Sequence, residues 1–485
     1  MPSLSKIQQV TAIALQQYPE IAARYNAGDP TVTAPIQAMQ HMLAELSRDV
    51  DVSELEPFVK SREATILADA SNKGILPLAE PCQHYVTILN NGNSRMTIAS
   101  GRTFEDGQGR PWRFLQNAEI LAGKETRVLA EQSQVRQIER TIVESAPFYQ
   151  FTLPIEEDMS LVSLNVRDQD DNIYNFVTRW MNTLAGDHAI ILKTDSLRDI
   201  TLEFGDSSLY GRTLAANTVL TINIRESYGY IDPNILKEAS FQEILTPQES
   251  RLRLRFDIGG LVRMGANPLS VEQMRLLASY PTHDDNAVFL GNFDFLIRKK
   301  FMARTHYINV WNESIHEQYF GANVENINHL FVSFVPKNGG EYSLMGEEIR
   351  QHIGKADSLY AGERTRLVAV EQRQFKIFIK GTLAPVHDVE TVKAQIKSLL
   401  LSNYGKEQMA SSYHLPNGFN LQEINKLMNR SILAFQDRQS DFKIDIEDLD
   451  KNPIKPNQWL YIGDGSITFD IKTSKGMGES LWAIL

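Results

Sequence analysis

The first seventy residues place apolar side chains three and four positions apart, which is the spacing of one narrow stripe along a helix. The pattern breaks at 28–30 and then resumes. It predicts two amphipathic helices, followed by a third helix that begins at Ser53 with Glu56 completing its cap. The stripe consists of Leu4, Ile7, Ala14, Tyr18 and Ile21 before the break, and of Ile36, Met39, Leu43, Leu46 and Val50 after it.

This stripe has two interpretations. In the first, the helices pack it against their own domain, as ordinary amphipathic helices do. In the second, they use it to bundle with helices of other chains, since heptad spacing is typical of such contacts. The second interpretation predicts that the ten stripe residues form an N-terminal interface between chains.

After Gly74 the hydrophobic pattern changes to a period of two, which predicts strands with one buried and one exposed face. The sequence NNGN at 90–93 predicts a hairpin between the runs 85–89 and 95–100. Further alternating runs are separated by turn residues, so we expect an antiparallel β-rich region divided near 147–154. The alternating apolar positions include Val162, Leu164, Val166, Ile200, Leu202, Phe204, Leu220, Ile222 and Ile224.

The pattern is weakest between 235 and 355. Helical spacing at 270–280 and at 292–301 predicts two helices, and the apolar run 329–335 is typical of a strand. We expect a mixed α/β connecting region in this part of the chain.

Residues 356–485 combine predicted strands with two helices, at 388–404 and 420–435. The second helix has more apolar positions than one buried stripe requires. We expect this face to contact a second copy of the chain, and the alternative is that it covers the sheet of its own domain. The apolar positions are Leu421, Ile424, Leu427, Met428, Ile432 and Phe435.

Together these patterns predict a multidomain α+β protein with N-terminal helices, an antiparallel β-rich middle and a C-terminal α+β domain. The expected parts are an N-terminal helical segment, two β-rich domains, the connecting region and a C-terminal dimerisation domain, at 1–75, 76–150, 151–234, 235–355 and 356–485.

Composition and charge limit the kinds of partner and metal site that the sequence favours. The 485 residues include 49 basic and 60 acidic side chains, and the resulting net charge of −11 disfavours nucleic acid and anionic membranes as partners. Cys82 is the single cysteine, so one chain offers neither a disulfide nor a thiolate metal site. The sequence has no secretory signal pattern and no apolar run that approaches a membrane span. We therefore expect a protein that is made in a cytoplasm and stays soluble.

No catalytic motif is complete. His316 and Glu317 begin like the helix motif of zinc proteases, but the second histidine is absent. The stretch 448–452 begins like a calcium loop, yet Pro453 stands where that loop turns at glycine. The polar cluster 283–285 is expected to be a solvated loop. We therefore expect a protein that is not an enzyme and needs no metal or cofactor, although distant segments can also combine into a catalytic site.

Three motifs together resemble the baseplate J-like family, which contributes the large wedge subunits of contractile phage tail baseplates. The first reads ASGRTFED at 99–106 and is followed by AEILAG at 118–123. The second reads LEFGD at 202–206, followed by YGR at 210–212 and ANT at 216–218. The third is GG at 259–260 with NPLSVEQMR at 267–275, followed by DDNAV at 284–288 and FDFL at 293–296. Their order and rough spacing are similar to the family's over about 95–300. The chain departs from the family's pattern at Ser207, Ala216, Asn217 and Phe295.

The resemblance implies a structural protein of the virion, located in the tail baseplate and assembled in the host cytoplasm. It implies that N-terminal helices of two large subunits bundle with those of a smaller wedge subunit, and that the C-terminal domain pairs two copies. Further partners would be hub, sheath-initiating or fibre-network proteins. It implies no catalytic residue, because the family has no known active site.

Two other functions remain open from the sequence. One is a binding or adaptor module for carbohydrate or fibres, which would gather exposed aromatic side chains, whereas the five tryptophans here are scattered. The other is a metal-dependent hydrolase that combines distant side chains, such as His283, Asp284, His306 and His316.

Overall fold

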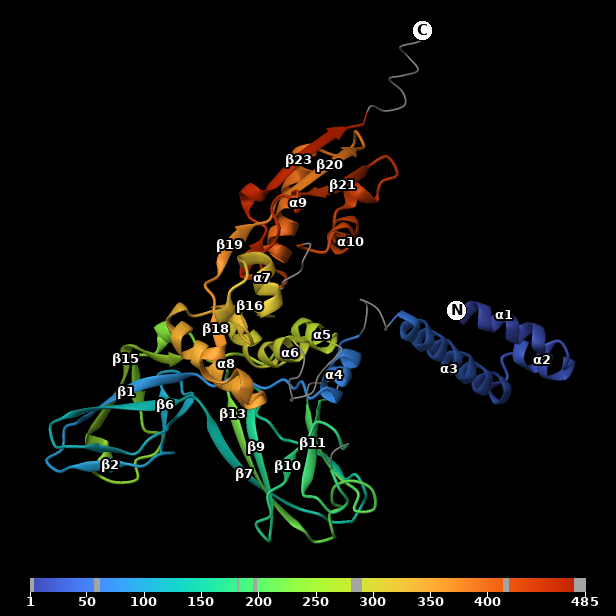
Figure 1. Cartoon of the computed structure of the whole chain (residues 1–485). Helices are drawn as coiled ribbons and strands as arrows, with labels where there is room; N and C mark the ends of the chain where they lie inside the picture. The colour runs from blue at the N-terminus through green and yellow to red at the C-terminus, as the bar shows by residue number, and fades with distance from the viewer. Residues whose placement is uncertain are drawn as a thin grey trace. The chain divides into compact units, whose positions relative to one another are not determined.

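The computed structural model describes residues 4–55, 62–180, 183–194, 199–280, 290–412 and 418–474, with side chains from 6–46 and from 62 onward within these ranges. The chain divides into two compact units, which are Met1–Asp69 with Thr194–Asp199, and Ala70–Lys193 with Ile200–Leu485. The described residues form ten α-helices and seven sheets with mostly antiparallel pairing (Figure 1). This confirms the predicted multidomain α+β class, whereas the domain boundaries above stay predictions.

Three helices of the first unit contact one another. The turn before the longest of them is built by Gly28, whose φ of +74° is left-handed, and by Asp29, whose carboxylate accepts hydrogen bonds from the backbone N–H and the hydroxyl of Thr31 at 3.0 and 2.6 Å. Pro30 fits the first position of the next helix, where an N–H would have no intrahelical acceptor. The helices are α1 (Leu4–Leu15), α2 (Pro19–Asn26) and α3 (Pro30–Leu55).

The prediction of a helix that begins at Ser53 is wrong. Ser53 lies inside α3, which continues to Leu55, and the following helix is α4 (Glu63–Asn72). Helical spacing persists beyond Val50, and the helix therefore extends past the residue that resembled a cap.

The second unit begins with a closed barrel in the order β1-β15-β14-β3-β4-β6. Phe104, Trp112 and Phe114 fill it together with Phe256 from β15. Its last two strands come from the stretch that the sequence assigned to the connecting region. The strands are β1 (Gln83–Asn90), β3 (Thr103–Asp106), β4 (Pro111–Phe114), β6 (Glu125–Glu131), β14 (Glu238–Ser240) and β15 (Leu252–Arg263), with a side pair of β2 (Met96–Ile98) and β5 (Ala118–Ile120).

The predicted hairpin at 90–93 is also wrong. Strand β1 pairs with β15 and β6, and β2 pairs with β5 instead of β1. The buried side chain of Asn90 explains the difference, because its Nδ2 donates to the carbonyls of Ser94 and Ile120 at 2.8 and 3.2 Å, and its Oδ1 accepts from the Gly92 N–H. These bonds hold a turn that leads the chain away from β1.

A second β module packs two sheets around one core, with orders β7-β13-β9 and β10-β11-β12-β8. Leu220, Ile222 and Ile224 on the central strand β13 are buried, as the alternation predicted. The strands are β7 (Gln134–Thr141), β8 (Gln150–Thr152), β9 (Ser160–Asp168), β10 (Asn175–Phe176), β11 (Ala189–Thr194), β12 (Ile200–Phe204) and β13 (Val219–Ser227).

A central α/β module follows, in which α6 and α8 share one core with the sheet β16-β17-β18. Ser270 and Gln273 form a complete capping box at the start of α5. The elements are α5 (Val271–Ala278), α6 (Leu290–Phe301), β16 (Thr305–Asn312), α7 (Glu313–Phe320), β17 (Leu330–Pro336), α8 (Tyr342–Ala356) and β18 (Thr365–Leu367).

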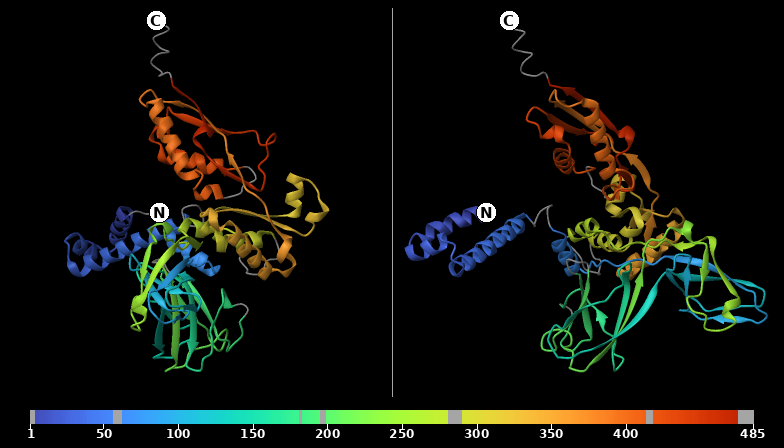
Figure 2. Two further views of the ribbon diagram at one scale, coloured as in Figure 1. Left: turned by 90° about the vertical axis from the view of Figure 1, so that its left-hand side faces the viewer. Right: turned by 180° about the vertical axis from the view of Figure 1, so that it is seen from behind.

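The C-terminal module has its own core between two helices and a sheet of order β21-β20-β23. Figure 2 shows the longer helix lying along one face of this sheet. Asp388 and Asn420 cap the two helices. The elements are β19 (Glu371–Gln374), β20 (Ile377–Leu383), α9 (Val389–Tyr404), α10 (Leu421–Ser431), β21 (Asp441–Ile446), β22 (Gln458–Tyr461) and β23 (Ile467–Thr473), with β19 and β22 forming a separate pair.

Buried polar contacts join these modules of the second unit. The carboxylate of Glu131 in the barrel accepts from Gln83 at 3.0 Å and from Arg113 at 3.2 Å, and it pairs with Arg225 of the second β module. Burial favours the neutral form, but the Gln83 hydrogen bond and the charges of Arg225 and Arg113 outweigh it and hold the pKa of Glu131 below its usual value.

A second joint connects the central and C-terminal modules. The hydroxyl of Tyr307 and the amide of Asn309 both donate to the carbonyl of Pro456, at 2.8 and 2.7 Å. All three groups are buried, so the Pro456 carbonyl is satisfied by these two donors and not by water.

Candidate interaction surfaces

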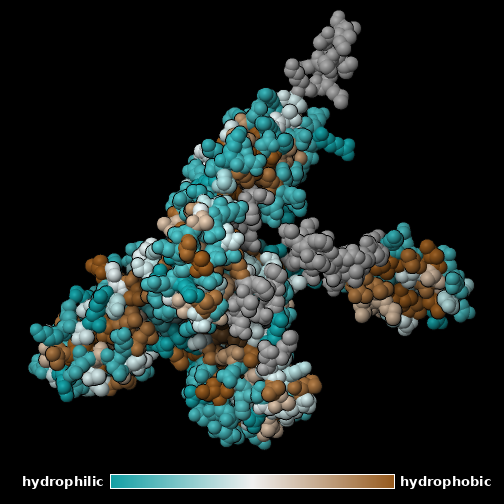
Figure 3. Space-filling model, viewed as in Figure 1, coloured by the Kyte–Doolittle hydropathy of each residue, from teal (hydrophilic) through white to brown (hydrophobic). Residues whose placement is uncertain are grey.

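The outer side of α3 exposes four large apolar side chains, which we call the α3 stripe. Met39, Met42, Leu43 and Leu46 are 66%, 72%, 53% and 59% exposed. They occupy positions i, i+3, i+4 and i+7, so they lie on one side of the helix. Figure 3 shows hydrophobic side chains gathered on this helical unit.

The same unit buries little between its helices. Gln40 is the single buried side chain among the described side chains 6–46, and its Nε2 donates to the hydroxyl of Tyr25 at 3.4 Å. The contact between the helices therefore includes a polar residue, while most of the large apolar side chains face outward.

The predicted stripe residues differ from one another in how exposed their side chains are. Met39, Leu43, Leu46, Tyr18, Ile21 and Ala14 are exposed, Ile7 and Ile36 are half-buried, and the side chains of Leu4 and Val50 lie outside the described residues. Sequence reasoning missed Met42, Val10 and Ile13, which are also exposed. Met42 lies three residues after Met39, so a search for a wider apolar face would have found it.

The six apolar positions predicted to pair two copies through α10 lie against the core of their own module. Ile424, Met428, Ile432 and Phe435 are buried, and Leu421 and Leu427 pack against the same cluster. The large exposed side chain next to this helix is Leu433. Pairing of C-terminal modules stays a prediction, but these six side chains are covered within the chain.

In the motif LEFGD…YGR, the close approach of neighbouring atoms requires glycine at positions 205 and 211. A Cβ on Gly205 would lie 2.3 Å from the Tyr210 carbonyl oxygen, and a Cβ on Gly211, with its φ of +71°, would lie 2.8 Å from the Trp180 ring. The motif therefore forms a close crossing of two chain segments at the end of β12. These residues have an architectural role that requires no bound ligand.

The histidines considered as metal ligands make aromatic contacts. The ring of His316 stacks on Phe331 with 3.8 Å between centroids, and its Nδ1 accepts from Trp311 Nε1 at 3.3 Å. Burial lowers the pKa of His316 and that of His306, which stacks on Trp459. In the described ranges, no three His, Cys, Asp or Glu side chains gather closely enough to hold a metal ion.

Other candidate residues are placed as follows. The carboxylate of Asp448 accepts from the backbone N–H of Asp450 at 3.2 Å, which is an ordinary turn contact. The Cys82 thiol is buried, and burial raises its pKa to about 12. The cluster 283–285 lies outside the described residues.

Within the ranges given above, no helix is both long enough and apolar enough to cross a membrane.

Comparison with known proteins gives structural likeness alone. No family model and no curated protein matches the chain. One similar solved structure is the six-fold symmetrised cryo-EM structure of the anti-feeding prophage baseplate, with 11% identity, coverage of 95% of this chain and 90% of that chain, and a TM-score of 0.27. Another is the cryo-EM structure of the TssK-TssF-TssG baseplate subcomplex of the type VI secretion system, with 9% identity, coverage of 70% and 96%, and a TM-score of 0.31. Likeness at this level does not establish a function for this chain.

Proposed function

We propose that the chain is a structural wedge subunit of a contractile-tail baseplate. It would hold subunits around the base of the tail tube and transmit the signal that triggers contraction. The α3 stripe carries this proposal, because it is an exposed apolar helix face that needs a partner. The ordered motifs at 99–106, 202–212 and 259–275 favour this class of protein over other scaffolds.

The energetics of the α3 stripe favour bundling with other helices. Fully burying an exposed leucine or methionine side chain contributes about 1.5–3 kcal/mol, and four such side chains lie together here. Helices as short as α1 and α2 gain little stability from their own backbone and depend on packing. A helical partner with matching heptads would cover the stripe and stabilise α1–α3.

The joints of the second unit support a role in transmitting motion. Glu131 fixes the barrel to the second β module through Arg225, and Pro456 fixes the C-terminal module to β16 through Tyr307 and Asn309. In each joint a buried acceptor, the Glu131 carboxylate or the Pro456 carbonyl, accepts from a side chain of the neighbouring module. A displacement applied to one module would therefore move its neighbour.

The proposed partners follow from these surfaces and from the family resemblance. A second copy of this chain and a smaller wedge subunit would complete the helical bundle at the α3 stripe. Hub, sheath-initiating or fibre-network proteins would contact the β modules. We propose no enzymatic step, because the candidate histidines and acidic residues that the structure describes are occupied in stacking and turn contacts.

The test is to express the tagged full-length chain together with the products of the genes that flank its own. We expect a stable hetero-oligomer, visible by mass measurement and by negative-stain electron microscopy. The variant Leu43→Asp/Leu46→Asp should lose these partners, since buried unpaired carboxylates cost several kcal/mol.

The matched control is Leu433→Asp, which also places a carboxylate at an exposed leucine but in the C-terminal module. It should retain the partners. Purification of the wild-type chain alone, as a monomer, in the presence of all flanking gene products would contradict the proposed function. Unchanged assembly of the Leu43→Asp/Leu46→Asp variant would contradict the role of the stripe.

A further inference from the structure

Strand β7 leaves one edge of the sheet β7-β13-β9 without a partner strand among the described residues. The strand has 8 residues, and its pairing with β13 continues without a bulge from Gln134 to Thr141. Figure 1 shows β7 at the border of the second β module. An edge of this length and regularity can pair with a further strand.

The hydrogen bonds of the sheet show which backbone groups of β7 are unpaired. On β9, the Val166 carbonyl accepts from the Tyr174 N–H at 3.0 Å and so faces away from β13. Val166 lies opposite Ile222 and Ile222 lies opposite Ile138, so the backbone groups of Ile138 bond to β13. The groups that point outward, which we call the β7 edge, are therefore the N–H and C=O groups of Val135, Gln137, Glu139 and Thr141. In the described part of the chain they have no hydrogen-bond partner.

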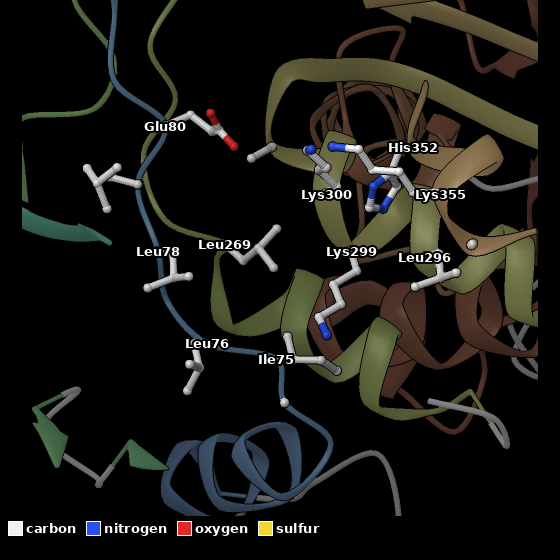
Figure 4. A pocket seen from close by; sticks show the side chains of 15 residues that line it. Ile75, Leu76, Leu78, Glu80, Leu269, Leu296, Lys299, Lys300, His352 and Lys355 are labelled. Carbon is white, nitrogen blue, oxygen red and sulfur yellow. The ribbon is translucent and has the colours of Figure 1, made fainter. Parts of the chain in front are cut away.

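The opposite edge of the same sheet is covered by the chain itself. There the backbone N–H of Ala79 donates to the Leu161 carbonyl of β9 at 2.9 Å. Figure 4 shows this stretch running extended past Leu76, Leu78 and Glu80. The sheet therefore accepts an extended segment at one edge, and the β7 edge offers the same kind of main-chain groups.

The side chains of β7 limit what can pair there. Ile138 is half-buried on the core side of the strand, and Arg136 and Arg140 flank it on that side. Arg136 Nη2 pairs with the Glu226 carboxylate at 2.7 Å. Arg140 Cζ lies 5.5 Å from the centroid of the Phe151 ring, and no carboxylate of the described residues is at ion-pair distance from Arg140. Inward charges at a sheet edge disfavour an arbitrary strand, so a partner that brings a carboxylate to Arg140 is favoured.

We propose that the β7 edge binds an extended segment of another protein, which adds to the sheet as an antiparallel strand. The segment carries an apolar side chain opposite Ile138 and a carboxylate opposite Arg140. A second copy of β7 does not supply this carboxylate, because β7 has no acidic residue on its core side. Main-chain hydrogen bonds provide the affinity, and the two opposed side chains provide the specificity. This binding goes beyond the assembly through the α3 stripe and does not depend on it.

The test measures binding of a labelled peptide, TEKITVTV with blocked ends, to the full-length chain by fluorescence anisotropy. In the register that places its isoleucine opposite Ile138, its glutamate lies opposite Arg140 and its lysine opposite Glu139. We expect saturable binding, and slower amide hydrogen exchange within 134–141 when the peptide is bound. The peptide TKKITVTV, with lysine in place of that glutamate, should bind about threefold more weakly, which is the size of one cross-strand charge pair. Arg140→Glu should reverse this preference.

The main-chain contact is tested at Gln137, whose N–H points outward. Gln137→Pro removes this donor and keeps the hydrogen bonds to β13, since edge strands tolerate proline at such positions. It should lose the peptide, whereas the matched control Gln137→Ala should retain it. Circular dichroism verifies that both variants are folded, and Arg140→Glu, which leaves the backbone unchanged, tests the same edge independently.

Three results would overturn the proposal. The first is no saturable binding of TEKITVTV at the highest soluble concentration of the chain. The second is equal binding of the two peptides by the natural chain. The third is self-association of the chain alone that Gln137→Pro abolishes, which would assign the β7 edge to a second copy.

Discussion

Helices α3 and α10 have similar apolar spacing and opposite environments. On α3, Met39, Leu43 and Leu46 follow one another at three and four positions and are exposed. On α10, Ile424 and Met428 are spaced in the same way and are fully buried. Spacing therefore predicts that a helix has an apolar side, but the rest of the fold decides whether that side is covered within the chain.

The difference comes from what surrounds each helix. In the C-terminal module, β20 and α9 contribute Ile377, Ile379, Val392, Ile396 and Leu400 to the same core as α10. In the first unit, α3 packs against the short helices α1 and α2, and Gln40 is the single buried side chain among the described side chains 6–46. We infer that the C-terminal module stabilises itself, whereas the helical unit gains most of its stability from partners.

The largest expected effect is a difference in stability between a substitution on α10 and a substitution on α3. Met428→Asp should unfold the C-terminal module, because burying an unpaired carboxylate costs several kcal/mol. Leu43→Asp/Leu46→Asp should change the unfolding free energy of the isolated chain by no more than about 0.5 kcal/mol per site, as exposed substitutions usually do. Thermal unfolding followed by circular dichroism measures both. A large loss of stability in the α3 variant would show that the stripe is already buried in the isolated chain.

A smaller effect is expected where modules are joined by buried charge. Glu131→Ala should destabilise the second unit by roughly 3 kcal/mol, the lower end for a broken buried pair, because Arg113 and Arg225 keep some contact with solvent. The α3 stripe has no comparable charged contact. Urea titration of the variant gives the value, and a change below about 0.5 kcal/mol would mean that Glu131 does not hold the joint.

The pH dependence of this joint follows from the lowered pKa of Glu131. Ionised Glu131 stabilises the fold at all pH values above the ordinary range for glutamate, and this contribution is lost as the pH falls through the lowered folded-state pKa. Glu131→Gln cannot ionise, so the stability difference between the natural chain and this variant should shrink between pH 7 and about pH 3. A constant difference would show that Glu131 does not act through its charge.

The smallest effects concern the helix caps. Asn420→Ala should lower the stability of the C-terminal module by about 1 kcal/mol, because Asn420 Oδ1 accepts from the backbone N–H of Gln422 and Glu423 at the start of α10. Asp29→Ala should fray the start of α3, which is measured as lost helical signal. It should leave the cooperative unfolding of the second unit unchanged, and a joint loss of both would contradict the independence of the two units.

Local chemistry in the sequence was enough to predict several features. Glycine and proline at 28–30 marked a break between two helices, the predicted helix start at 420 coincides with the cap of α10, and the alternation around Ile222 marked a buried strand. Each depends on residues that are close together in the chain. The exposure of Met39, Leu43 and Leu46 could be proposed from heptad spacing but not established, because it depends on what the rest of the chain leaves uncovered.

Features that depend on distant residues could not be predicted. Strand β1 pairs with β15, about 170 positions later, and no local pattern encodes that partner. The hairpin prediction failed because Asn90 bonds to Ile120, a residue outside the turn. Coverage of α10 likewise comes from β20 and α9, which the spacing along α10 itself does not reveal.

Methionine oxidation tests most directly whether the α3 stripe is an interface between chains, because the chain contains both exposed methionines on the stripe and a buried methionine as a control. Met39 and Met42 are exposed on the α3 stripe, whereas Met428 on α10 is fully buried. In the isolated chain treated with hydrogen peroxide, mass spectrometry should find Met39 and Met42 oxidised and Met428 protected. After assembly with the flanking gene products, all three should be protected. Oxidation of Met39 and Met42 at an unchanged rate in the assembled complex would contradict the claim that the α3 stripe is an interface between chains.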